Sequence, residues 1–130
     1  MNLDHIGSWL DRKLALQPLA LNEPRSVTER HTRIYGPLGE FAAVSLSATP
    51  SEAFSFVSHA NWPRENYDTA ILDGILDIFL CVGVSGVGSG AAFFVDSIEW
   101  HDVDSNAVAY YHASKAATKA IIADNLRTMS

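Results

Sequence analysis

The feature that most constrains the fold is a change in the spacing of apolar residues near the middle of the chain. Between residues 41 and 48, apolar side chains occupy every second position, and Ser45 and Ser47 lie between them. From residue 67 to about residue 82, apolar side chains recur every three to four positions. A period of two is typical of a strand with one buried face, and a period near 3.6 is typical of an amphipathic helix. The chain is therefore expected to combine a sheet with helices.

The same patterns, with turn signals between them, predict the remaining elements. We expect strands at 25–34, 53–59 and 91–100, an N-terminal amphipathic helix at 2–16, and a last helix from about 105 to 125. The order is helix, three strands, helix, strand, helix. Helices on one face of the sheet would give a two-layer α+β fold. The short link between the second and third strands predicts that these two form an antiparallel hairpin.

Two finer expectations concern the last strand and the helix after it. Strict alternation places Ile98 and Trp100 on the same face as Ala92 and Phe94, opposite to Phe93 and Val95. Asp104 or Ser105 is expected to cap the following helix, because short side chains with an oxygen acceptor satisfy its first N–H groups. The packing face of that helix is expected to include Ala107, Tyr110, Tyr111, Ser114, Ala117 and Ile121.

Length and composition limit the classes of protein that fit this chain. A chain of 130 residues with 48% hydrophobic and 18% charged residues suits one globular domain. No apolar run reaches the roughly 18 residues of a membrane span. Charges at Asp4, Asp11 and Arg12 interrupt any secretory signal, so we expect a cytoplasmic protein without membrane contact. Cys81 is the one cysteine, and its apolar neighbours predict a small buried residue.

The charge of the chain is acidic and unevenly distributed. The net charge is −6 and the pI is about 5.2. Proteins that hold nucleic acid by neutralising phosphates are usually basic, so most of this surface would repel RNA. Basic residues gather in one strand, and we expect them on a solvated edge of the sheet: Arg25, Arg30, His31 and Arg33.

Two segments of the chain resemble domain IV of translation elongation factor G. Residues 63–75 read PRENYDTAILDGI, with a tyrosine, an aspartate and a glycine-isoleucine pair at the spacing of that family. Residues 97–105 read SIEWHDVDS and precede an alanine-rich helix, and this is the stronger match. A looser match covers 27–29 and 36–44. The resemblance spans about residues 25–124, which suggests a helix and linker at 1–24 and a domain at 25–130.

The resemblance implies a four-stranded sheet with a left-handed βαβ crossover and a binding tip made of two loops. His101 matches a histidine of one tip loop, and the candidate binding residues of the two loops are Trp100, His101, Asp102, Asp104, Arg33, Tyr35 and Gly36. The loop at 34–39 departs from the family because it has lost an arginine and most glycines and has gained Pro37. Such a loop has few donors or cations for a phosphate.

The function expected from the resemblance is that of a non-catalytic binding module without a cofactor. No nucleotide-binding motif occurs in the chain, so GTPase activity is not expected. The partner would be the ribosome or another protein. A second hypothesis is that the fold serves protein–protein contact or self-association, with the segment at 2–16 as a candidate contact for a homo-oligomer.

Two weaker alternatives involve small ligands. The segment GVGSGAA at 86–92 resembles the phosphate loop of small-metabolite kinases, but a phosphate site needs a helix directly after the glycines, and the pattern there predicts a strand. His101, Asp102 and Asp104 are also a plausible set of metal ligands. A plain loop followed by a helix cap is the favoured interpretation. The acids Asp73 and Asp77 are expected to lie on a solvated helix face.

Overall fold

The apolar patterns become the strands and helices that they predict. The computed structural model of the chain describes residues 19–35, 38–81, 90–102 and 104–128. Its elements, in chain order, are β1 Leu19–Leu21, β2 Arg25–Tyr35, β3 Leu38–Pro50, β4 Ser55–Ser58, α2 Asp68–Cys81, β5 Ala91–Glu99, α3 Ala107–Ile122 and β6 Leu126–Thr128. The helix expected at 2–16 lies outside the described residues.

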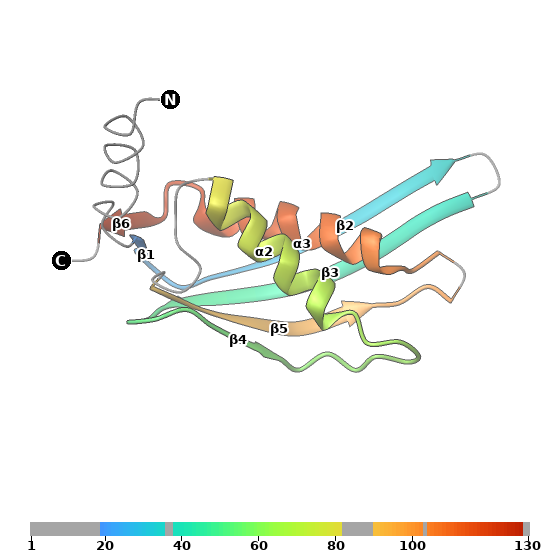
Figure 1. The fold of residues 1–130 in the computed structure, drawn as a ribbon, viewed down its shortest axis with the longest axis horizontal. Coiled ribbons are helices and arrows are strands. Elements are labelled where there is room, and N and C mark those ends of the chain that lie inside the picture. Colours follow the sequence, from blue (N-terminus) through green and yellow to red (C-terminus); the bar gives the residue numbers. More distant parts are fainter. Residues whose placement is uncertain (1–18, 36–37, 82–89, 103, 129–130) are drawn as a thin grey trace, which may run out of the picture.

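The fold has two layers, a four-stranded sheet and a pair of helices. The strand order is β2-β3-β5-β4, and α2 and α3 cover one face of this sheet (Figure 1). β2 and β3 pair antiparallel without a break from Arg25↔Ala48 to Tyr35↔Leu38. The alternating pattern of the sequence placed four side chains of β3 on one face. All four are fully buried: Ala42, Val44, Leu46 and Ala48. The predicted α+β sandwich is therefore confirmed.

The connection from β4 through α2 to β5 is left-handed. β4 and β5 are parallel neighbours, and both run toward the right of Figure 1. The helices lie in front of the sheet in this view, and β5 lies above β4, so the path turns in the left-handed sense. Parallel crossovers are right-handed in nearly all proteins. The handedness implied by the family resemblance is therefore present in this chain.

The predicted hairpin between the second and third main strands is wrong. β3 and β4 follow each other in the chain with a short link, yet β5 lies between them and pairs with both. Among the strands after β3, β5 shows the clearest alternation of buried residues, because Ala91, Phe93 and Val95 all face the core. A strand that buries this much apolar surface is favoured in the middle of the sheet. Four-residue β4 takes the edge instead.

A register shift in β5 corrects the predicted faces of this strand. Leu46 pairs with Val95 but Ser45 pairs with Ser97, so Asp96 is an extra residue on β5. Such a bulge reverses the alternation after it. Ile98 therefore packs against the core on the same side as Phe93, and so does Trp100 beyond the end of the strand. The expectation that both would share a face with Ala92 and Phe94 is wrong.

The expected caps of the last helix, Asp104 and Ser105, are wrong by two residues and one residue. The cap is Asn106, whose side-chain oxygen accepts a hydrogen bond from the N–H of Ala109 at 2.8 Å. The expected packing face is right at Tyr110, Ser114, Ala117 and Ile121. It is wrong at Ala107, which is exposed, and Tyr111 is only half-buried. The buried stripe also includes Ala109, Ala113, Thr118 and Ile122.

The segment before β2, expected to be a linker, contains the short strand β1. β1 pairs antiparallel with β6, and Asn125 joins this small sheet to the rest. The buried Asn125 side chain accepts from the N–H of Glu23 and donates to the carbonyls of Glu23 and Ile121, each at 3.0 Å. The Arg25 guanidinium donates to the carbonyls of Ala120 and Ala123 at 2.9 and 2.8 Å. Arg25 thus caps the end of α3.

The contact between α2 and α3 depends on Gly74. A Cβ there would lie 2.7 Å from the carbonyl oxygen of Tyr111 and would overlap the Ser114 hydroxyl. Gly74→Ala is expected to lower the free energy of unfolding by about 2 kcal/mol, although alanine in a helix normally gains about 1 kcal/mol over glycine. Thr69→Ala on the exposed side of α2 is the matched control, and it should be neutral or slightly stabilising. Urea unfolding of both variants measures this, and a stabilised Gly74→Ala variant would refute the close contact.

Candidate functional site

The candidate site is the end of the molecule where the β2–β3 hairpin closes and where β5 passes into α3. Both segments lie at the right of Figure 1, and the hairpin projects beyond the helices. Two hydrogen bonds join them through the backbone of Phe41. Its N–H donates to the carbonyl of Asp104 at 2.9 Å, and its carbonyl accepts from the Ser105 hydroxyl at 2.9 Å. The two segments that the resemblance assigned to a tip are therefore in direct contact.

Ser105 holds the loop at 100–105 in a closed shape. Its hydroxyl oxygen accepts from the N–H of His101 at 2.9 Å while the hydroxyl hydrogen is donated to Phe41. Its own N–H donates to the carbonyl of His101, also at 2.9 Å. One residue thus joins the start of the loop, its end and strand β3. Because these donors are satisfied within the protein, the loop keeps this shape without a ligand.

Within this loop, His101 contacts Asp104, and both lie against the hairpin. The N–H of Asp104 donates to Nδ1 of His101 at 3.3 Å, and an oxygen of the Asp104 carboxylate lies 3.5 Å from the same nitrogen. The His101 side chain is 54% exposed, and its ring lies 5.9 Å from the ring of Phe41. The Asp104 carboxylate lies against the backbone of Gly39, where a Cβ would come within 3.0 Å of Oδ1. Gly39 thus permits the close approach of the two segments.

Trp100 connects this loop to an aromatic cluster of the core. Its ring stacks at 5.6 Å from that of Tyr67 and at 6.2 Å from that of Tyr110, and Trp62 meets it edge-on at 6.1 Å. The hydroxyl of Tyr110 is anchored on the carbonyl of Glu99 at 2.5 Å, and burial raises the pKa of Tyr110. We call Trp62, Tyr67, Trp100 and Tyr110 the aromatic cluster. Sequence reasoning missed it, since its members come from three separate segments.

Asp102 brings the loop before α2 to the same end. Its carboxylate accepts from Nε1 of Trp100 at 3.1 Å and lies 3.9 Å from Nε of Arg64. Both charged side chains are about 70% exposed, so this pair contributes little to stability. The same pair presents one cation and one anion to solvent. Three segments therefore meet at this end of the molecule, one more than the resemblance implied.

The candidate residues of the hairpin are described less fully. Arg33 is exposed on β2, and Tyr35 is the last residue of that strand. Gly36 and Pro37 lie outside the described residues. The basic cluster of the sequence does not form one patch. Arg25 caps α3, and Arg30 pairs with Glu99 at 3.1 Å across the open face of the sheet.

A cluster of ionisable side chains lies behind the hairpin, between β2, β3 and α3. Nε2 of His31 lies 2.8 Å from the Glu40 carboxylate, and both side chains are less than 20% exposed. The ring of His112 on α3 lies 5.0 Å from the ring of His31. Desolvation lowers the pKa of His112, and the neighbouring His31, Lys115 and Arg33 lower it further, against a smaller opposite effect of Glu40.

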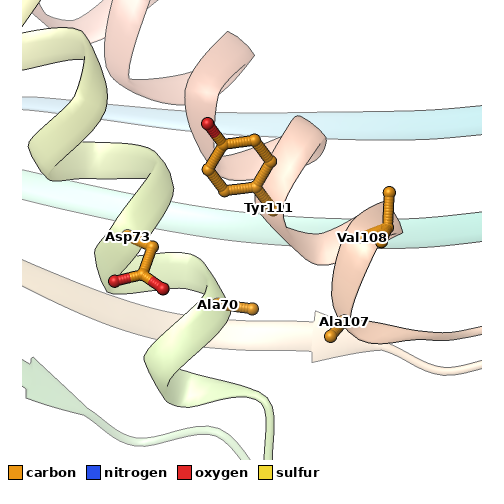
Figure 2. Close-up of a pocket in the computed structure, with 5 residues that line it drawn as sticks. All are labelled: Ala70, Asp73, Ala107, Val108 and Tyr111. Atoms are coloured by element: carbon orange, nitrogen blue, oxygen red, sulfur yellow. The ribbon is translucent and has the colours of Figure 1, made fainter.

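An open groove of about 210 Å³ lies on the outer side of the helices, away from the sheet. Figure 2 shows Ala70 and Asp73 of α2 facing Ala107, Val108 and Tyr111 of α3 across it. Val108 is 52% exposed, and Asp73 is exposed as expected. Asp77 differs from the expectation of a solvated face, because it is half-buried and accepts a short hydrogen bond from the Tyr111 hydroxyl.

The structure also bears on the ligand hypotheses. Among the described residues, no group of three or more His, Cys, Asp or Glu side chains is arranged to hold a metal ion, and His101, Asp102 and Asp104 are not brought together as such a group. Residues 82–89 of the glycine-rich segment, and the side chain of Cys81, lie outside what the structure describes. Strand β5 follows that segment at Ala91, as predicted. Within the same described ranges, no helix is long and apolar enough to span a membrane.

Comparison with known proteins supports the fold. No protein-family model matches the chain, and no curated protein matches it. Among solved structures, the chain is similar to the crystal structure of ttk003000868 from Thermus thermophilus, with a TM-score of 0.72 and 20% identity. The match covers 85% of this chain and 18% of that one. At this identity the similarity concerns the fold, and this chain corresponds to a small part of the larger Thermus chain.

The lowered pKa of His112 predicts an acid-sensitive stability. The imidazole of His112 binds a proton more readily in the unfolded chain than in the folded one. Its contribution to the free energy of unfolding is therefore complete above the ordinary pKa of 6.5. That contribution is lost as the pH falls through 6.5 toward the lower pKa of the folded state. His112→Gln should flatten the pH dependence between about pH 8 and about pH 5, as measured by urea unfolding. The exposed His59→Gln is the control. An equal slope in His112→Gln and the parent would contradict the burial of this ring.

Proposed function

We propose that the chain is a non-catalytic binding module that acts through the end of the molecule formed by residues 33–41 and 100–105, in the manner of domain IV of elongation factor G. The observation that carries this proposal is the tie between the two segments at Phe41, which accepts from Ser105 and donates to Asp104. A loop held by its own backbone and by a strand is preorganised, and preorganisation lowers the entropic cost of binding.

The groups offered at this end suit a polar, partly charged partner surface. His101 presents a half-exposed imidazole ring, Asp102 and Arg64 present opposite charges, and Arg33 adds a cation from the hairpin. Three features support the resemblance to the elongation factor domain: the four-stranded sheet, the left-handed crossover, and the position of His101 in the loop before α3. We therefore name the ribosome as the first partner to test. The acidic net charge of −6 restricts any RNA contact to this end.

The test is co-sedimentation with ribosomes through a sucrose cushion over a range of salt concentrations. The parent chain should pellet with ribosomes at low salt and lose binding as salt rises, since contacts to phosphates release counterions. His101→Ala should weaken binding by about tenfold, the usual cost of losing a hydrogen bond to a charged group.

A matched variant separates this contact from general charge effects. His59→Ala removes an exposed histidine from the loop after β4 and should bind like the parent. If the parent does not pellet at low salt, the ribosomal partner is wrong. If His101→Ala and His59→Ala bind equally, the tip is not the contact.

A second candidate is contact with another protein through the groove between α2 and α3. The half-exposed Val108 and the small side chains of Ala70 and Ala107 offer an apolar floor beside the Asp73 carboxylate (Figure 2). Exposed apolar side chains in a hollow are typical of protein contacts. This candidate gains support if ribosomes do not bind and if binding to a protein partner is lost in Val108→Lys.

A further inference from the structure

Within the described residues, one long edge of strand β2 pairs with no other strand. β2 is the first strand in the order β2-β3-β5-β4, and its backbone pairs with that of β3 alone among the described strands. Its 11 residues make it about twice as long as a typical strand. The pairing with β3 is regular over its whole length, without a bulge. β2 also contains no proline, so every backbone N–H on the edge away from β3 can donate to a further strand.

We propose that β2 pairs antiparallel with β2 of a second copy, centred on His31, so that the two sheets become one continuous sheet. Residues directly opposite each other in an antiparallel pair have their side chains on the same side of the sheet. The two copies of β2 can therefore pair only in registers that place odd-numbered residues opposite odd-numbered residues and even-numbered residues opposite even-numbered residues. Centring on Glu29 or on Arg30 would place identical charges opposite each other. Centring on His31 instead places Glu29 opposite Arg33 of the second copy, and the residue that faces its own copy is His31, which is charged only when it is protonated.

The charges of β2 favour this register. Centring on Val27 would also pair Glu29 with an arginine, but that residue is Arg25, whose guanidinium already donates to the carbonyls of Ala120 and Ala123. By symmetry the Glu29–Arg33 pair forms twice, once on each side of the twofold axis. Glu29 is half-buried on the side of β2 that faces the helices, and within the described residues it takes part in no ion pair. Arg30, on the other side of the sheet, would face Thr32 and avoid its own copy. Opposite charges placed directly across a strand pair stabilise the pair.

The helix layer is compatible with this arrangement. α3 lies over β2 and β3. With a strand spacing of about 4.8 Å, the axes of the two α3 helices would lie about 10 Å apart, close to the separation of packed helices. Ala116 and Ala120 follow His112 at four-residue spacing, so the three residues lie on the same side of α3. That side faces β2, where the ring of His112 meets His31, and its small side chains leave room for a second helix.

The experiment is a charge swap read by sedimentation velocity over a range of protein concentrations at low salt. The parent should form a dimer. Glu29→Arg and Arg33→Glu should each weaken dimerisation by at least about tenfold, because each places like charges together twice. The double variant carrying both changes should regain dimerisation, since it restores opposite charges in the same register.

Controls keep fold defects apart from loss of pairing. Glu52→Arg makes the same charge change on the exposed link before β4 and should dimerise like the parent. Circular dichroism checks that each variant is folded, and the rescue by the double variant excludes misfolding as the cause. A parent that stays monomeric at all concentrations would overturn the proposal. The proposal is also wrong if Glu29→Arg dimerises as well as the parent, or if dimerisation of the double variant remains weakened.

Discussion

The bulge at Asp96 is the feature on which the position of the candidate site depends. It lies in the middle of the β3–β5 pair, so β5 buries Phe93 and Val95 before it and turns Ile98 and Trp100 inward after it. A regular strand would have pointed Trp100 away from the helices. Instead its ring joins the aromatic cluster, and the chain leaves the sheet beside β3. His101 and Asp104 are positioned by this one extra residue.

The loop at 100–105 therefore has supports on both sides. On one side the stacked rings of Tyr67, Trp100 and Tyr110 fix its beginning. On the other side Ser105 and the backbone of Asp104 bind Phe41 of β3. Rigid elements on both sides make a loop a more precise binding surface than a free loop would be. The side chains that remain exposed, His101 and Asp102, lie on the outer surface of this supported loop.

Much of the fold could be predicted because the apolar periods of two and 3.6 are local signals. They indicated the types and approximate bounds of β2, β3, β4, α2, β5 and α3. The strand order could not be predicted from them, because the pairing of β5 with both β3 and β4 depends on contacts distant in sequence. The bulge was missed for the same reason, since Asp96 looks like any polar residue of an alternating strand. The left-handed crossover came from the family resemblance and not from periodicity.

The site was predicted in part. The resemblance placed both loops, and the structure brings them together at Phe41, although neither alternation nor charge could show that contact. Arg25 and Arg30 seemed to belong to one basic patch with Arg33, but a helix end and Glu99 divide them. The aromatic cluster was invisible in the sequence because Trp62, Trp100 and Tyr110 are separated along the chain and meet only after folding.

The most direct test of this account is amide hydrogen exchange at Phe41, measured by nuclear magnetic resonance in the parent and in Ser105→Ala. The Phe41 N–H is bonded to the Asp104 carbonyl, so its protection reports whether the loop stays on the hairpin. We expect strong protection of this N–H in the parent and at least about tenfold faster exchange in Ser105→Ala, with the exchange of Ile75 in α2 unchanged. Fast exchange at Phe41 in the parent, at the rate of an exposed loop, would contradict a tip made of two joined segments.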